Sequence, residues 1–197
     1  MKHFPRSRVC PWPGAVLAPT TRVLVVLAHP DDEIACGGLA QRLPPTARFL
    51  WVTDGDALAE GAGLRRPEYA AARHLESEAA MGAIGVSVDR LRFLGNSEVG
   101  IFEALARCAA KPNARHDVFE HARSLARQIT AEVLAFRPEV VFTVAWQGAH
   151  PVHDLVHLLV RHALRPPEHG GGGEGLRMQS LAADGVASGR SRVPGEA

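Results

Sequence analysis

A cluster of one histidine and three acidic residues directly follows a short, fully apolar segment near the start of the chain. The segment Val23–Leu27 contains only valine and leucine, which is typical of a strand buried on both faces of a parallel sheet. The run His29-Pro30-Asp31-Asp32-Glu33 comes immediately after that strand. Because open α/β sheets bind ligands at the carboxyl ends of their strands, this position predicts a functional site.

Strand-like and helix-like segments alternate through the middle of the chain. We expect strands at residues 23–28, 48–53, 90–94 and 140–145, and helices at about 32–43, 67–84, 118–136 and 152–164. The helix at 118–136 has the clearest period, with an apolar face made of Phe119, Ala122, Leu125, Ala126, Ile129, Val133 and Phe136. This alternation predicts an α/β fold of Rossmann-like type, a mainly parallel sheet with helices on both faces. No GxGxxG run joins an expected strand to an expected helix, so we do not expect a dinucleotide cofactor.

Three regions differ in composition. Residues 1–20 form a Pro-rich lead-in, residues 21–165 the α/β domain, and residues 166–197 a Gly-rich tail in which we expect no regular structure. A doubly wound sheet usually continues with further strands after the fourth strand–helix unit. We therefore expect the domain to be truncated at its C-terminal end.

Charge and cysteine content exclude several classes of protein. The net charge of +1 provides no basic surplus for binding nucleic acid. The three cysteines are odd in number and widely spaced, which favours a reducing, cytoplasmic location over a disulfide framework. No continuous apolar stretch precedes residue 23, so we expect neither a secretory signal nor a membrane span. The sequence does not predict the oligomeric state.

A second polar cluster, with His150, His153, Asp154 and His157, follows the strand expected at 140–145. Since parallel strands end at the same edge of a sheet, His29 and Asp32 can meet His150 or His153. Two histidines and a carboxylate make a hydrolytic zinc site, and the same donors suit Fe(II). Two other interpretations stay open: an N-cap role for the first acidic run, and a zinc protease site built on His153 and His157 at i, i+4 spacing.

The two clusters together resemble the PIG-L/LmbE-like N-deacetylases, zinc enzymes that remove acetyl groups from N-acetylglucosamine-type substrates and related amides. The resemblance covers about residues 23–164 and includes further matching positions at Gly37, Gly38, Arg73, Glu76, Ala80, Gly85, Phe93, Leu94 and Gly95. It implies a metal-dependent hydrolase that acts on a small N-acetylated sugar or glycoconjugate.

The resemblance also implies a role for each matching site residue. His29, Asp32 and His153 would hold Zn²⁺, with Fe²⁺ as the alternative metal. Asp31 would be the general base, and His150 would stabilise the tetrahedral oxyanion. Arg73 would contact the substrate.

This chain departs from the family pattern at Val152, where the family usually has an aspartate that orients and charges the first histidine of the pair. Asp154, one turn away, is the candidate substitute. The family also continues past its last shared helix with segments that shape the substrate pocket, where this chain has the Gly-rich tail. A catalytically degenerate metal- or sugar-binding domain is therefore the alternative to a deacetylase.

Overall fold

A parallel sheet organises residues 17–111, 115–165 and 177–181, the part of the chain that the computed structural model describes. Its strands are β1 (Val23–Leu27), β2 (Arg48–Thr53), β3 (Leu91–Asn96), β4 (Val140–Val144) and β5 (Arg177–Leu181). They lie in the order β3-β2-β1-β4-β5, and each neighbouring pair is parallel. The strand order reverses at β1, which has β2 on one side and β4 on the other. The predicted Rossmann-like α/β fold is confirmed.

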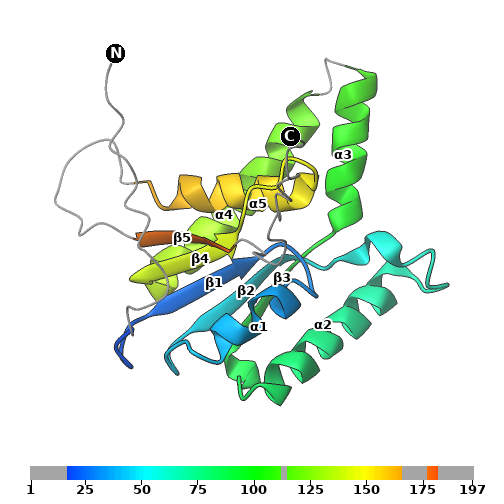
Figure 1. The fold of residues 1–197 in the computed structure, drawn as a ribbon. Coiled ribbons are helices and arrows are strands. Elements are labelled where there is room, and N and C mark those ends of the chain that lie inside the picture. Colours follow the sequence, from blue (N-terminus) through cyan, green and yellow to red (C-terminus); the bar gives the residue numbers. More distant parts are fainter. Residues whose placement is uncertain (1–16, 112–114, 166–176, 182–197) are drawn as a thin grey trace, which may run out of the picture.

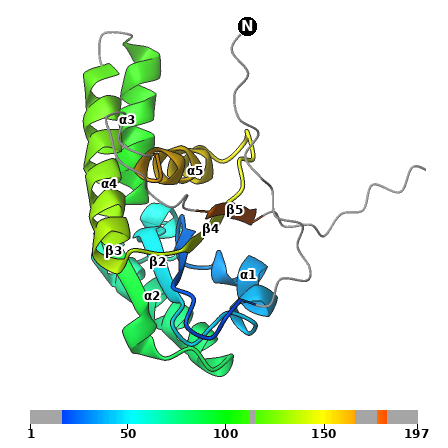
Figure 2. The ribbon, with the colours of Figure 1, turned by 90° about the vertical axis from the view of Figure 1, so that its left-hand side faces the viewer.

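Helices cover both faces of the sheet (Figure 1). α1 (Glu33–Ala40) and α2 (Arg66–Ala83) lie on one side, and α4 (Arg115–Phe136) and α5 (Pro151–Ala163) on the other. α3 (Glu98–Ala110) runs beside α4, and this pair projects beyond the sheet (Figure 2). Because helices exclude water from both faces, the five apolar residues of β1 are all buried. None of the described helices is long and apolar enough to span a bilayer.

α4 shows how the apolar period of the sequence becomes packing. Leu125, Ile129 and Val133 recur every four residues and are all buried against the rest of the core. Phe119 was predicted on the same face, but it is 58% exposed. It belongs to the first turns of α4, and the start of α4 extends beyond the sheet beside α3 (Figure 2).

α3 is a helix that the sequence analysis did not predict. Its N-cap is Ser97, whose Oγ accepts the backbone N–H of Gly100 at 3.2 Å. Ile101 and Ala104 form its buried face. A capping serine followed by apolar residues three positions apart is the sequence signal that would have indicated this helix.

β5 corrects the prediction that residues 166–197 contain no regular structure. Residues Arg177–Leu181 pair in parallel with β4, from Val140 opposite Arg177 to Val144 opposite Leu181. Within the described sheet, β5 is an edge strand that pairs through its backbone on one side, so its sequence needs no continuous apolar run. The rest of the predicted tail, and residues 1–16 of the predicted lead-in, lie outside the described residues.

Candidate active site

The loop between β1 and α1 is held in place by its own carboxylates. Asp32 Oδ2 accepts the backbone N–H groups of Ala28 at 2.7 Å and His29 at 3.1 Å. Asp31 has a φ of 108°, a backbone conformation that residues with a Cβ rarely adopt. Its carboxylate contacts His29 and Arg73, whereas Asp32 Oδ1 lies 3.2 Å from His153. The two adjacent aspartates therefore share His29 as a partner, but only Asp31 contacts Arg73 and only Asp32 contacts His153.

His29 presents its two ring nitrogens to different groups. Its Nδ1 lies 2.9 Å from Asp31 Oδ1, and its Nε2 lies 3.1 Å from the Nε2 of His153. A carboxylate on one ring nitrogen is the usual environment of a metal-ligating histidine, because it fixes the tautomer and leaves the other nitrogen free. Burial acts to lower the pKa of His29, but the hydrogen bond to Asp31 and the negative charge of Asp32 outweigh it and raise this pKa to about 9.

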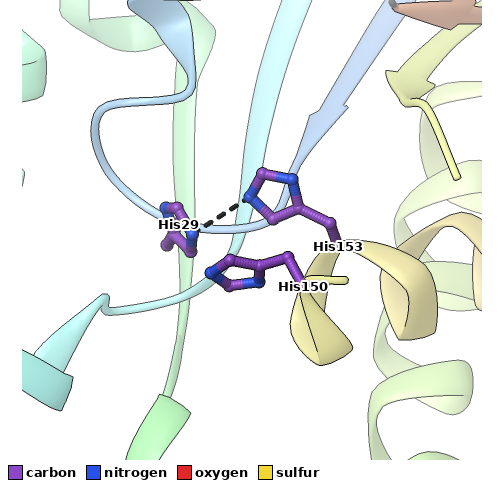
Figure 3. Close-up of side chains that lie close together, drawn as sticks. All are labelled: His29, His150 and His153. Carbon is purple, nitrogen blue, oxygen red and sulfur yellow. Dashed lines mark hydrogen bonds between the residues drawn. The ribbon is translucent and has the colours of Figure 1, made fainter. Parts of the chain in front are cut away.

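The start of α5 brings two more imidazoles to the same place. His150 is the residue that precedes the helix, and His153 is buried in its first turn. The His150 and His153 rings have centroids 4.3 Å apart, and those of His29 and His150 are 5.2 Å apart. Figure 3 shows the three rings close together: His29 comes from the loop after β1, His150 from the residue before α5, and His153 from α5 itself. The site therefore lies where the strand order reverses between β1 and β4, as expected for an open α/β sheet.

The donor atoms around His153 have separations that suit a metal ion. Its Nε2 lies 3.1 Å from His29 Nε2 and 3.2 Å from Asp32 Oδ1. Two ligands bound tetrahedrally to zinc at about 2.0–2.1 Å lie about 3.3 Å apart, so each of these two separations suits a pair of ligands on one ion. Among the described residues, two groups of three have donor atoms that all lie within 4.8 Å of one another: His29, His150 and His153, and His29, Asp31 and Asp32. The predicted set of His29, Asp32 and His153 is divided between these two groups. Burial raises the pKa of Asp32, but its contacts with His153 and His29 lower it overall, which keeps the carboxylate ionised.

His150 has no carboxylate partner among the described residues. Its Nδ1 is buried without a hydrogen bond, and Val152, at the family's aspartate position, is packed in the apolar core. Asp154 does not substitute through a hydrogen bond, since its Oδ1 accepts the backbone N–H groups of Gln147 and Gly148. Burial and the charges of His153 and His29 lower the pKa of His150. His150 is therefore a neutral imidazole near neutral pH.

Arg73 of α2 lies next to Asp31. Its guanidinium donates to Asp31 Oδ2 at 2.6 Å and to the backbone carbonyl of Pro30. Burial raises the pKa of Asp31, but its contacts with His29 and Arg73 outweigh this and hold the pKa below its ordinary value. The Asp31 side chain is still 46% exposed. It is thus an ionised carboxylate that both Arg73 and solvent can reach.

A cavity of about 340 Å³ opens beside these residues, a size at the lower end of small-ligand pockets. The predicted site residues His29, Asp31, Arg73 and His150 line this cavity. Its other lining residues were not predicted as site residues: Pro30, Gly55, Ala57, Leu58, Tyr69, Glu98 and Phe102. Glu98 is buried at the start of α3. Burial, together with the nearby charges of Asp56 and Asp31, raises the pKa of its carboxyl group. Recognising Ser97 as a helix cap would have placed Glu98 at the start of a helix, directly after the strand β3.

Asp56 fixes the start of α3 and with it the cavity wall. This buried carboxylate accepts the Ser97 hydroxyl at 2.6 Å and the N–H groups of Glu98 and Val99 at 2.7 and 3.2 Å. Hydrogen bonds to charged groups contribute about 1.5–3 kcal/mol, so Asp56→Ala is expected to lower the free energy of unfolding by about 3 kcal/mol. Urea denaturation measures this change. The exposed control Asp89→Ala is expected to change it by less than about 0.5 kcal/mol, and an equal loss in both variants would contradict the capping role.

His157 does not join the metal-ligand candidates. It is buried, and its Nδ1 lies 2.9 Å from the carbonyl oxygen of Val144 at the end of β4. Neither group of converging donor atoms in the described residues contains His157. The zinc protease interpretation pairs His153 with His157, and the contact of His157 with Val144 gives that pair no support.

The chain is thus an α/β protein with a parallel sheet. Its histidines and carboxylates gather where the strand order reverses, which is an enzyme-like site. The family model PIG-L, described as GlcNAc-PI de-N-acetylase, matches residues 24–164, which is more than half of the chain. The chain belongs to the PIG-L family. No curated protein matches it.

Several solved structures share the fold. The N,N'-diacetylchitobiose deacetylase from Pyrococcus horikoshii is 22% identical with a TM-score of 0.50, and the match covers 72% of this chain and 48% of that one. A deacetylase of the teicoplanin biosynthesis pathway is 24% identical with a TM-score of 0.54, covering 73% and 65%. A conserved protein from Thermus thermophilus is 26% identical with a TM-score of 0.50, covering 82% and 64%. The chain thus spans less than two thirds of the length of each of these structures.

Proposed function

We propose that this chain is a metal-dependent hydrolase that removes the acetyl group from an N-acetylated amino sugar or glycoconjugate. One observation carries the proposal: His29 Nε2 and Asp32 Oδ1 lie within 3.2 Å of His153 Nε2, beside a cavity that also contains the carboxylate of Asp31. Membership of the PIG-L family and the likeness to deacetylase structures support it.

His29, Asp32 and His153 would hold the metal. Two imidazoles and one carboxylate favour zinc, and Fe(II) is the alternative. When bound, such a metal lowers the pKa of a coordinated water to about 7 and polarises a carbonyl group.

The remaining side chains would transfer protons, stabilise the oxyanion and bind the substrate. Asp31, held ionised beside Arg73, would take a proton from the attacking water and later give it to the departing amine. His150, at the cavity wall, would donate a ring N–H to the oxyanion of the tetrahedral intermediate. Arg73, Tyr69 and Glu98 line the same cavity and offer groups that can bind sugar hydroxyls.

Acetate release tests the substrate class. The zinc-loaded chain is incubated with N-acetylglucosamine, with N,N'-diacetylchitobiose and with N-acetylated amino acids, and the acetate formed is measured. The proposal predicts faster release from the two sugars. Equal or faster release from the amino acids would overturn the assignment to amino sugars.

A metal- or sugar-binding domain without catalytic activity is the second candidate, because Nδ1 of His150 is buried without a partner and Val152 supplies no carboxylate. An imidazole that no neighbour orients is a weaker donor to an oxyanion. Stoichiometric zinc binding without acetate release from any N-acetylated sugar would favour this candidate.

Arg73→Ala is expected to lower kcat/KM by about 10- to 100-fold, because a catalytic group displaced by about 1 Å can cost a factor of that size. The variant loses the contacts of Arg73 with Asp31 and with the Pro30 carbonyl. Removing the cation also raises the pKa of Asp31, so the acidic limb of the pH–rate profile should move to higher pH. Arg66→Ala, on the exposed start of the same helix, is the matched control. An unchanged profile in Arg73→Ala would contradict the role of Arg73.

A further inference from the structure

Glu33 connects the loop between β1 and α1, which contains Asp31, to the core elements β2 and α2. It is 5% exposed in the first turn of α1, and its carboxylate accepts hydrogen bonds from three separate places. Oε2 accepts the backbone N–H of Asp31 at 2.9 Å and the indole N–H of Trp51 at 3.1 Å, and Oε1 accepts the Ser77 hydroxyl at 2.7 Å. All three partners are donors, so the Glu33 carboxylate accepts in every one of these contacts.

The backbone of Asp31 needs such support. A residue with a Cβ at a φ of 108° is in an unfavourable conformation, which persists only when surrounding contacts hold it. Glu33 holds the N–H of that residue. Its other two partners are well fixed, because Trp51 in β2 and Ser77 in α2 are both fully buried. Through Glu33, the backbone of Asp31 is therefore held by two buried side chains, one in the sheet and one in α2.

A helix-dipole role alone does not account for this arrangement. A carboxylate in the first turn of a helix is favourable on an exposed surface and needs no side-chain partners. Glu33 is instead removed from solvent, and each of its oxygens is engaged with another element. Burying a charged group is costly unless hydrogen bonds compensate, which indicates a specific structural task.

We propose that Glu33 is a positioning residue, which fixes the backbone of Asp31 so that the Asp31 carboxylate lies between His29 and Arg73. Asp31 Oδ1 is 2.9 Å from His29 Nδ1, and Oδ2 is 2.6 Å from the guanidinium of Arg73. The catalytic part of this inference rests on the proposed function, in which Asp31 is the general base. The contact itself can be tested without any activity.

Kinetics of three variants test the catalytic part. Glu33→Ala is expected to lower kcat by about 10- to 100-fold, the cost of a misplaced catalytic group, with KM and zinc content unchanged. Glu33→Gln is expected to stay within about threefold of the wild type, since its amide oxygen can accept both N–H groups and its amide nitrogen can donate to Ser77. Glu60→Ala, an exposed control, should match the wild type. A wild-type kcat in zinc-loaded Glu33→Ala, or an equal loss in Glu33→Gln, would overturn the proposal.

Amide hydrogen exchange tests the contact in the wild-type chain. The N–H of Asp31 is expected to exchange at least about 100-fold more slowly than an unprotected amide, although it lies in a loop. Glu33→Gln should keep this protection and Glu33→Ala should lose it. Exchange of the wild-type amide at the unprotected rate would overturn the proposal whatever the activity. Protection that depends on Glu33 supports it even where the wild type releases no acetate, in which case only the proposed activity fails.

Discussion

Asp31→Asn is expected to lower kcat by about 10²–10⁴-fold at saturating zinc, because an amide has the shape of the carboxylate but cannot accept the proton of the attacking water. The amide oxygen can still accept the Nδ1–H of His29, so the loop should keep its conformation. The ion pair with Arg73 is lost, but Asp31 is about half exposed and solvent screens much of that interaction. We therefore expect the folded variant to bind the metal.

Zinc content and kcat, measured together on Asp31→Asn, separate the roles that this residue could have. Retained zinc with a large loss of kcat is the expected result. A kcat near that of the wild type would remove Asp31 from the mechanism. Loss of zinc as well would identify it as a ligand, in line with the alternative grouping of His29, Asp31 and Asp32. Asp89→Asn, on the surface, is the control for the chemical change.

His29→Ala and His153→Ala are expected to weaken zinc binding by more than about 100-fold. Loss of a group that merely orients a ligand costs about 10- to 100-fold in metal affinity, and loss of a ligand itself costs more. The reason is the geometry around His153 Nε2, which has donor atoms of His29 and Asp32 within 3.2 Å. Isothermal titration with zinc measures the change.

His157→Ala is the matched control for those two variants, since it removes an imidazole from the same helix as His153. It loses the contact with the Val144 carbonyl, which should cost about 1–3 kcal/mol of stability, but it should bind one zinc per chain. The opposite pattern, with zinc lost in His157→Ala and kept in His29→Ala, would support the protease interpretation.

The fold follows from the sequence where burial dictates the residue type. Val23–Leu27 is apolar because helices cover both faces of the sheet, and this makes the strand recognisable. The period in α4 is clear for the same reason. β5 is different, because an edge strand forms by backbone pairing and leaves little trace in residue type. α3 was missed because the prediction did not use the cap at Ser97.

The proximity of His29, Asp32 and His153 was predictable, because all three follow strands that end at the same edge of the sheet. Glu33 was also noticed in the sequence, but only as part of the first acidic run, for which an N-cap role stayed open. Its contacts with Trp51 and Ser77 depend on how β2 and α2 pack against α1, which no local pattern specifies. Likewise Glu98 reaches the cavity because α3 starts at the end of β3, a placement that comes from the tertiary fold.

The most direct test of a metal-dependent deacetylase is to measure acetate release from N,N'-diacetylchitobiose while zinc is added back to chelator-treated protein. The proposed site predicts negligible release from the stripped chain and a rise in rate that ends at about one zinc per chain. Full activity in the stripped protein would contradict the metal dependence. No release at full zinc occupancy, from this substrate or any other N-acetylated sugar, would contradict the deacetylase.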